Sequence, residues 1–317
     1  MSERTAEPGT PDSMSHPVAH VIWDPIILNE PQRLTDVRSW HGHLRFAMWV
    51  VSATRPRSIV ELGTHKGDSY SAFCQAVKVL AIPAKCFAVD TWHGDTQSGN
   101  YADDVYQDLI RHNREHFADF STLLRGTFDE ALTKIENQSV DLLHIDGFHS
   151  YQAVRYDFES WLPKLSDRAV VLIHDCAVVE PGFGVWRYWD ELCRKYPHFT
   201  FHHSNGLGLL AVGKDIPDKI RPLLNISKTD AACLRHLFEN LAAASESPAD
   251  SLPTPDHLLN PEMLDAFLYE LQQNKCRVPV RSYRQQKFRY VKRVAQRYRS
   301  QFTRNVKGRL AALIARH

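Results

Sequence analysis

Hydrophobic and polar positions follow two different periods over residues 58–212, and their alternation predicts the architecture. Short apolar runs bounded by Gly, Pro or acidic residues predict strands, and apolar residues three or four positions apart predict helices. The expected strands are Ser58–Leu62, Cys86–Asp90, Thr122–Leu124, Asp141–Ile145, Ala169–Ile173, Phe199–His203 and Leu209–Val212. The expected helices are Asp68–Leu80, Ala102–His116, Phe128–Glu136, Tyr151–Leu165 and Val185–Lys195. This order predicts an α/β fold with a doubly wound, mostly parallel, seven-stranded sheet that ends in an antiparallel hairpin.

The pattern also divides the chain into segments. Residues 1–20 are predicted to be a disordered leader, because they lack the apolar core of a signal peptide. Residues 21–56 form a helical lead-in, and residues 57–214 form the central domain. Residues 215–280 are expected to be a helical extension, interrupted by a Ser- and Pro-rich linker. Residues 281–317 repeat apolar positions every three or four residues among basic ones, which predicts a basic amphipathic tail.

Composition narrows the class of protein. A hydrophobic content of 43% and a charged content of 24% are typical of a soluble globular chain. The six cysteines form no C-x-x-C pair, which favours a reducing, cytoplasmic setting over a zinc site or disulfide framework. The net charge of +1 conceals an asymmetry, since residues 281–317 hold 12 Lys and Arg and no acid. The remainder then has 38 − 12 = 26 basic residues against 37 acidic ones, a net charge of −11.

The first expected strand leads into a glycine turn, I-V-E-L-G-T-H-K-G-D-S, in which Gly63 and Gly67 allow a close approach of the backbone to a ligand. The helix that begins next offers free N–H groups to an anionic group. Glu61 is placed to meet a cation. His65 stands where the dinucleotide fingerprint G-x-G-x-x-G has its second glycine, which counts against NAD. Asp90 ends the second strand, the usual place of a ribose-binding carboxylate.

The stretch D-L-L-H-I-D-G-F-H-S-Y carries the strongest sign of chemistry. Asp146 follows a buried strand, and His149 returns an imidazole three residues later. Ligands of open parallel sheets bind at the carboxyl ends of the strands, so an acid and a base there indicate a reaction site. The alternative, equally open for these residues alone, is that Asp146 caps a helix and His149 is a surface residue. The next strand ends similarly, in His174 and Asp175.

Together, E-L-G-x-x-x-G-x-S, V-D-T-W, I-D-G-x-H-S-Y and I-H-D resemble the class I S-adenosylmethionine-dependent methyltransferases, in particular the small-molecule and sugar O-methyltransferase type. The resemblance spans roughly residues 57–213 and implies a Rossmann-like methyltransferase fold. It implies cofactor contacts in three groups. Glu61, Gly63, Thr64 and Gly67 would contact the methionine part. Asp90 would bind the ribose, with Trp92 beside the adenine. Gly126, Thr127 and Phe128 would contact the adenine. Thr127 departs from the family, which usually has an acid at this position.

Relatives that bind magnesium use carboxylates at the ends of the fourth and fifth strands, which are Asp146 and Asp175 here. Cys176 follows where a third oxygen ligand is common, and a thiol is a poor ligand for magnesium. Methyl transfer requires a positioned, deprotonated hydroxyl, and His149 has a suitable pKa for the base. Asp146 would orient the imidazole or the acceptor, while His174 with Asp175 is the alternative pair.

The sequence therefore predicts an S-adenosylmethionine-dependent O-methyltransferase acting on a sugar or another small natural-product acceptor, as in polysaccharide or natural-product biosynthesis. Alternatives are an NAD(P)-dependent oxidoreductase, a metal-dependent hydrolase and a non-catalytic scaffold in glycan assembly. Trp186 and Trp189 are candidates for an aromatic acceptor wall, with core packing as the alternative. His202, His203 and Asn205, near the expected hairpin, are candidates for the same cavity mouth. No nucleic-acid partner is expected. The basic tail is a candidate for contact with a partner protein or with the inner membrane surface of a cytoplasmic protein, and a homo-oligomer is a further expectation.

Overall fold

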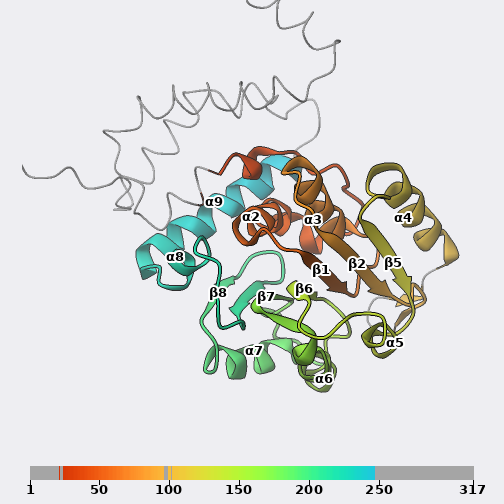
Figure 1. Cartoon of the computed structure of the whole chain (residues 1–317). Coiled ribbons are helices and arrows are strands. Elements are labelled where there is room, and N and C mark those ends of the chain that lie inside the picture. The colour runs from red at the N-terminus through yellow and green to blue at the C-terminus, as the bar shows by residue number, and fades with distance from the viewer. Residues whose placement is uncertain (1–20, 22–23, 96–98, 101, 247–317) are drawn as a thin grey trace, which may run out of the picture.

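The computed structural model describes residues 21, 24–95, 99–100 and 102–246. Its centre is a seven-stranded sheet in the order β5-β2-β1-β6-β7-β9-β8 (Figure 1). The strands are β1 Ser58–Leu62, β2 Lys85–Asp90, β5 Ser121–Arg125, β6 Val140–Ile145, β7 Leu165–His174, β8 His198–Phe201 and β9 Leu207–Ala211. The first five of these pair in parallel, whereas β9 pairs antiparallel with both β7 and β8. The predicted mostly parallel sheet with an antiparallel hairpin is confirmed.

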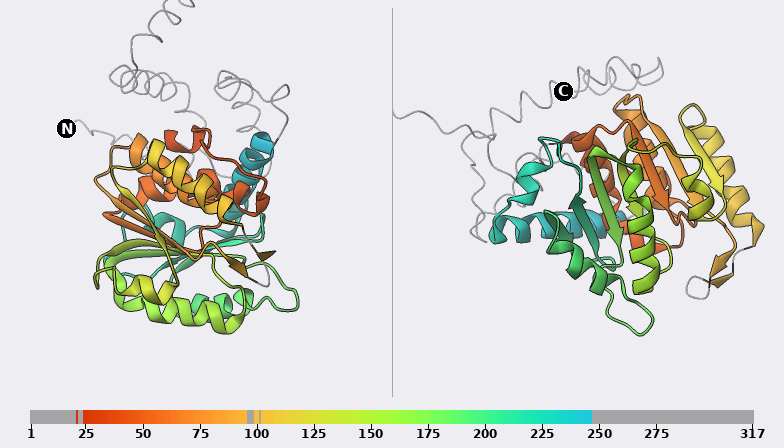
Figure 2. Two further views of the ribbon diagram at one scale, coloured as in Figure 1. Left: turned by 90° about the vertical axis from the view of Figure 1, so that its right-hand side faces the viewer. Right: turned by 60° about the horizontal axis from the view of Figure 1, so that its bottom comes forward.

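Helices cover both faces of the sheet, which lies between them in the edge-on view (Figure 2). One layer contains α2 Leu44–Thr54, α3 Asp68–Val79 and α4 Asp103–His116, and the other contains α5 Phe128–Leu132, α6 Tyr151–Trp161 and α7 Val185–Cys193. The short elements are η1 Pro25–Leu28, η2 Arg38–His43, η3 Leu162–Lys164 and the ribbon β3 Gly94–Asp95 with β4 Gly99–Asn100. Beyond the sheet, α8 Arg221–Leu224 and α9 Lys228–Glu246 form a helical extension, as predicted.

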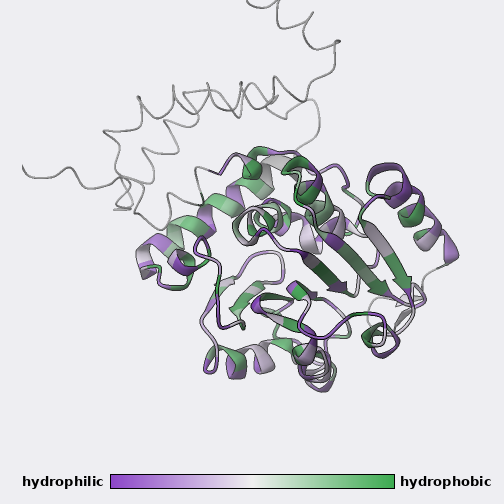
Figure 3. Cartoon of the chain, in the orientation of Figure 1, coloured by the Kyte–Doolittle hydropathy of each residue, from purple (hydrophilic) through white to green (hydrophobic). Residues whose placement is uncertain are grey.

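The strands build two cores because successive side chains point to opposite faces. Ile59, Leu142 and Val170 join the cluster that contains α2 and α3. Val60 and Leu143 join the cluster that contains α6 and α7. Hydrophobic residues accordingly concentrate in the central strands, whereas α4 is largely hydrophilic (Figure 3).

Several predicted boundaries differ from the structure, and two of the larger differences arise around Pro163. The helix expected over Tyr151–Leu165 ends at Trp161, because Pro163 lacks the N–H that an α-helix needs and a 3-10 turn replaces it. Strand β7 consequently begins at Leu165 instead of Ala169. The lead-in helix also divides, into η2 and α2. The predicted leader (1–20), the basic tail (281–317) and residues 247–280 of the extension lie outside the described residues, and the proposed domain boundaries stay predictions.

Candidate active site

A cavity of about 620 Å³ opens at the carboxyl ends of β1, β2, β6 and β7. Most of the residues expected from the sequence line it: Gly63, Thr64, Gly67, Asp90, Thr127, Phe128, Asp146, His149, His174 and Asp175. Glu61, Trp92 and Gly126 do not. The cavity therefore brings the glycine turn and the acid and histidine residues, which lie some 80 residues apart in the chain, to one place.

The glycine turn is tightly packed against the end of β6. Gly63 has φ +85°, and a Cβ built there would lie 2.0 Å from the Asp146 carbonyl oxygen. Only glycine meets both conditions. Gly67 (φ +81°) then starts α3, where a Cβ would lie 2.5 Å from Leu109. Thr64 lies between them, and its buried hydroxyl has no hydrogen-bond partner in the described protein. The turn thus presents backbone and one uncommitted hydroxyl to the cavity.

Asp90 holds the glycine turn in place. Its Oδ2 accepts hydrogen bonds from the amides of Thr64 (2.9 Å) and His65 (2.8 Å), and its Oδ1 accepts one from Trp92 N (2.7 Å). A carboxylate has about four acceptor positions, so Asp90 keeps capacity for a hydroxyl of a ligand. The sequence predicts that Asp90 contacts the ribose. In the structure Asp90 also anchors the glycine turn.

The sequence-based roles of Trp92 and Glu61 need correction. Trp92 is fully buried, and its indole Nε1 donates to the His65 carbonyl at 2.8 Å, so it supports the turn from behind instead of facing an adenine. Glu61 is also fully buried, and its Oε2 lies 2.8 Å from Nδ1 of His144. Burial raises the pKa of Glu61, and the His144 imidazole offsets part of that rise. Neither side chain reaches the cavity.

The segment after β5 contributes mainly Phe128. Gly126 donates its N–H to the Asp90 carbonyl and lies outside the cavity wall. The Thr127 hydroxyl caps α5 by accepting from the Glu130 amide, and the Glu130 carboxylate accepts from Thr127 N. This capping box occupies the polar atoms expected near the adenine. The Phe128 ring lies on the wall and packs on Gly147, where a Cβ would come within 2.6 Å of it.

Two carboxylates and two imidazoles meet on the other side of the cavity. His149 Nε2 lies 2.8 Å from Asp175 Oδ2 and 3.8 Å from Asp146 Oδ1. His174 Nδ1 lies 3.3 Å from Asp146 Oδ1, and its Nε2 lies 3.0 Å from the Ser204 carbonyl oxygen. Both ring nitrogens of His174 face acceptors, so the ring is held as a double donor. Asp146, His149, His174 and Asp175 are called the acid–imidazole cluster below.

The cluster shifts its own protonation equilibria. Burial alone would lower the pKa of His149, but the carboxylates of Asp146 and Asp175 outweigh it and raise that pKa to about 9. Burial likewise opposes the charge of His174, yet Asp146 and Asp175 raise its pKa well above its usual value. The imidazoles in turn overcome burial of the acids, lowering the pKa of Asp175 to about 2 and holding that of Asp146 well below its usual range. At neutral pH the cluster therefore contains two carboxylates and two imidazolium ions.

Comparison with known proteins agrees with this geometry. Residues 60–176 match the sequence profile of a family described as a methyltransferase domain. This segment of the chain is therefore similar to a methyltransferase domain. That match covers β1 to the end of β7, which includes the glycine turn and the acid–imidazole cluster.

One curated relative of this chain, the uncharacterized protein y4gI of Sinorhizobium fredii (strain NBRC 101917 / NGR234), is 49% identical over 220 residues. The match covers 69% of this chain but 24% of the relative, so the chain spans about a quarter of that protein's length. Similar solved structures include the SAH-bound methyltransferase PaMTH1 of Podospora anserina, with 13% identity and a TM-score of 0.43. That alignment covers 64% of this chain and 89% of the other. The O-methyltransferase TomG of Streptomyces achromogenes, in complex with SAM, has 14% identity and a TM-score of 0.41, with 57% and 91% covered.

The acid–imidazole cluster also has the donor set for a divalent cation. One ligand atom each from Asp146, His149 and Asp175 lies within 4.8 Å of the others. Asp175 has φ +58°, a strained conformation for a non-glycine residue, and its buried Oδ1 has no hydrogen-bond partner within the described protein. Two carboxylates and an imidazole suit a transition metal at least as well as magnesium. The Cys176 thiol is buried outside this group, and burial raises its pKa, so it adds no ligand.

Sequence reasoning missed part of the cavity wall. Val37, Ser39 and Trp40 line the cavity, although the segment that contains them, residues 21–56, was predicted only as a helical lead-in. Phe183 lines it as well, and its ring stacks on His149 with centroids 4.8 Å apart. Of the three hairpin residues expected at the cavity mouth, Asn205 lines the cavity and His202 and His203 do not.

Neither tryptophan proposed as an acceptor wall reaches the cavity. Trp189 is buried on Gly208, where a Cβ would lie 2.2 Å from the indole, and Trp186 is 40% exposed. The alternative of core packing is therefore correct for Trp189.

Proposed function

We propose that this protein transfers the methyl group of S-adenosylmethionine to a hydroxyl of a small acceptor, a sugar or another natural product. The observation that carries the proposal is that one cavity joins the glycine turn at the end of β1 to the acid–imidazole cluster at the ends of β6 and β7. A cofactor on the first side and a hydroxyl on the second would face each other, and positioning is most of what an enzyme must supply for this displacement.

On the cofactor side, Gly63, Thr64 and Gly67 would hold the methionine part. The Thr64 hydroxyl is buried without a partner, which costs free energy unless a ligand satisfies it. Asp90 would accept from the ribose through its remaining lone pairs, and Phe128 would offer its ring to the adenine. Trp92 and Glu61 would act behind this layer, by supporting the turn.

On the acceptor side, His149 would take the proton of the hydroxyl as the oxygen attacks the methyl carbon and the carbon–sulfur bond breaks. Asp146 and Asp175 would stabilise the imidazolium ion that forms. His174 cannot be this base, because both of its nitrogens already face acceptors, Asp146 Oδ1 and the Ser204 carbonyl. We assign His174 to positioning Asp146.

A pKa of about 9 makes His149 a strong base that is rarely free at neutral pH. On the order of one molecule in a hundred would have a neutral ring at pH 7, so metal-free turnover should rise with pH up to about 9. The alternative to a His149 base is a divalent cation held by Asp146, His149 and Asp175, which would supply positive charge that lowers the pKa of an acceptor hydroxyl while His149 serves as a ligand. The cluster fits such an ion, so magnesium or a transition metal remains part of the proposal.

Calorimetric titration with S-adenosylhomocysteine and NADH tests the cofactor half. Binding of the first ligand and not the second is expected, because His65 crowds the turn; the opposite result would favour the oxidoreductase. Labelled S-adenosylmethionine with a panel of sugars and phenols then tests the acceptor half. His149→Ala should leave cofactor affinity nearly unchanged and lower turnover by roughly two to four orders of magnitude. Unchanged turnover would remove His149 as the base.

The remaining expectations concern location and partners. No helix in the described part of the chain is long and apolar enough to cross a membrane. We retain as proposals a cytoplasmic location, a homo-oligomer and contact of the basic tail with a membrane surface or partner protein. A non-catalytic scaffold role in glycan assembly is the alternative if no cofactor binds.

A further inference from the structure

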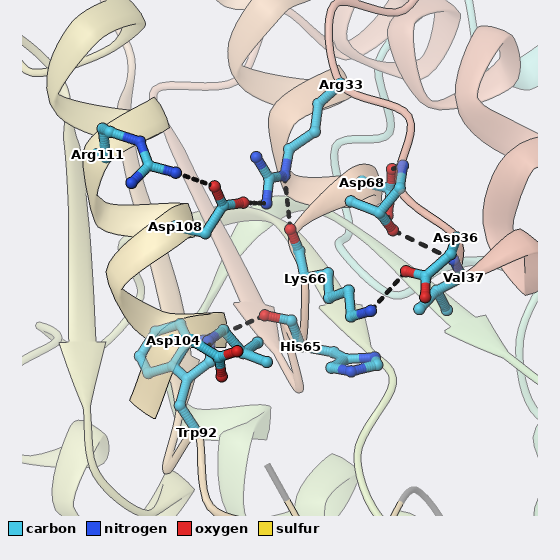
Figure 4. A network of polar contacts seen from close by, with 12 residues as sticks. Arg33, Asp36, Val37, His65, Lys66, Asp68, Trp92, Asp104, Asp108 and Arg111 are labelled. Atoms are coloured by element: carbon cyan, nitrogen blue, oxygen red, sulfur yellow. Dashed lines mark hydrogen bonds and ion pairs between the residues drawn. The ribbon is translucent and has the colours of Figure 1, made fainter. Parts of the chain in front are cut away.

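A strap of residues 33–41 crosses the glycine turn and the start of α3 (Figure 4). Its middle residues Val37, Ser39 and Trp40 form one wall of the cavity. Trp40 is 4% exposed, so the strap is packed into the structure and not merely laid over it. The strap comes from the segment before the methyltransferase profile, which begins at residue 60.

The firmest contact of the strap is with Asp68, the first residue of α3. Asp68 is buried, and its Oδ1 and Oδ2 accept hydrogen bonds from the Thr35 amide (2.7 Å) and the Thr35 hydroxyl (2.5 Å). His41 Nε2 approaches the same carboxylate at 3.8 Å. Both oxygens of Asp68 are thus directed to the strap. Hydrogen bonds to a buried charge are stronger than neutral ones, so this contact dominates the attachment.

Arg33 adds a second contact. Its Nε donates to the Lys66 carbonyl at 2.6 Å, and its Nη2 donates to Asp108 Oδ2 on α4 at 2.6 Å. The Arg33 side chain is only 10% exposed. The ion pair of Lys66 with Asp36 matters less, because the Asp36 side chain is 79% exposed and exposed pairs contribute little. Arg33 and Asp68 therefore form the latch of the strap.

The far end of the strap is continuous with η2, which is fixed to the turn between β8 and β9. His43 Nε2 lies 3.1 Å from the Ser204 carbonyl, and His203 Nε2 lies 3.1 Å from the Gly42 carbonyl. A Cβ on Gly42 would meet Ser204 Oγ at 2.1 Å, so this end is close-packed. At the near end, Gln32 N donates to Gln75 Oε1 on α3 at 2.9 Å. The strap is thus anchored on both sides, and between these anchors it is held mainly by the polar latch. Opening is expected in that middle part, at the latch.

We propose that the strap is a gate over the cofactor, and that the latch formed by Arg33 and Asp68 sets how fast the cofactor enters and leaves. The inference rests on the proposed cofactor site, since the latch grips the same glycine turn. In this proposal the latch closes the gate equally with and without the cofactor, so entry and exit both pass through an open state.

A gate of this kind has a kinetic signature. Weakening the latch raises the association and dissociation rate constants by the same factor and leaves Kd nearly unchanged. A wall residue that only contacts the ligand would instead raise the dissociation rate constant and Kd together. Thr35→Val keeps the shape of the side chain and removes its hydrogen bond to a charged group, so both rate constants should rise about tenfold.

The experiment is stopped-flow binding of S-adenosylhomocysteine to the full chain. Wild type is compared with Thr35→Val, Arg33→Gln and the control Arg155→Gln. Arg155 pairs with Glu159 from an exposed position on α6, which lies on the opposite face of the sheet from α3 and α4, so its loss should leave both rate constants as in wild type. Equal rises in both constants for the two latch variants support the gate. Unchanged constants, or a weaker Kd with unchanged association, would overturn it.

Amide hydrogen exchange of residues 33–41 without cofactor provides the second measurement. Strap amides should be protected in wild type and exchange about tenfold faster in Thr35→Val. Unprotected wild-type amides would overturn the gate whatever the binding kinetics show. Failure of wild type to bind S-adenosylhomocysteine would overturn the proposed function and the cofactor gate with it, whereas binding with unaltered rates in Thr35→Val would overturn the gate alone.

Discussion

The raised pKa of His149 predicts a pH-dependent contribution to folding stability that can be separated from catalysis. In the metal-free protein, Asp146 and Asp175 raise this pKa from 6.5 to about 9 against the opposing effect of burial. Each pKa unit corresponds to about 1.4 kcal/mol, so protonated His149 stabilises the fold by about 3 kcal/mol. The side chain is 20% exposed, and solvent screening therefore makes this figure an upper value.

The direction follows from linkage. A basic group whose pKa is higher in the folded state stabilises the fold fully below its unfolded pKa, and the contribution is lost as pH rises through the folded pKa. The loss should therefore occur between about pH 6.5 and about pH 9. Replacing His149 with Asn removes the titrating ring and with it this part of the pH dependence.

Urea denaturation in the presence of a chelator, at pH 6 and pH 9.5, measures the effect. Between these pH values wild type should lose about 2 to 3 kcal/mol more unfolding free energy than His149→Asn. His198→Asn, at an exposed position on β8, controls for the loss of a histidine outside the cluster. Equal pH dependence in wild type and His149→Asn, or an NMR titration of His149 near pH 6.5, would refute the electrostatic reasoning.

Three further predictions concern the loops and the core. Gly63→Ala should abolish cofactor binding because its Cβ would lie 2.0 Å from the Asp146 carbonyl, while Gly99→Ala, with a similar φ but no atom within 4 Å, should bind normally in the same calorimetric titration. Asp90→Ala should release the glycine turn and weaken S-adenosylhomocysteine binding at least about tenfold, and equal affinity would discredit both of its roles. Burial and the nearby Asp129 raise the pKa of Asp157 to about 7, so stability is lost as pH rises from about 4 to about 7. Asp157→Asn should therefore melt at a higher temperature than wild type at pH 8 but not at pH 4, and an equal difference at both values would contradict this.

The sequence was sufficient to place the strand ends, because two simple rules governed them. Apolar runs located β1, β2, β6 and β7, and the carboxyl ends of parallel strands share one edge of the sheet. The sequence therefore predicts that Asp90, Asp146 and Asp175 lie close together, and in the structure they line one cavity. No comparable rule gives the direction of a side chain on the loop that follows a strand. Trp92 is on such a loop, and its side chain is buried in the protein instead of lining the cavity.

The alternation of side chains along β1 could have predicted that Glu61 points away from the α6 and α7 side of the sheet. Val60 and Leu62 face the α6 and α7 side of the sheet, so the period of two places Glu61 on the opposite face. His144 occupies the equivalent position on β6, directly across from Glu61. Strand alternation alone would have paired these two residues beneath the turn. The strap could not be predicted in this way. Thr35 and Asp68 are 33 residues apart in the chain, and no periodic sequence pattern indicates the hydrogen bond between them.

The acid–imidazole cluster has one member whose protonation can change near physiological pH. Asp146 and Asp175 are held ionised, and His174 is held as a double donor between Asp146 and the Ser204 carbonyl. His149 remains, with Nε2 directed at Asp175. A proton on this nitrogen and a divalent cation bound by the same three side chains would occupy the same carboxylate-lined position, so they must compete. Cation affinity should consequently rise with pH up to about 9, because binding displaces the His149 proton. A His149 ring that ligates the cation is no longer available as the base, so the rise of turnover with pH expected for the metal-free protein should be lost when the cation is bound.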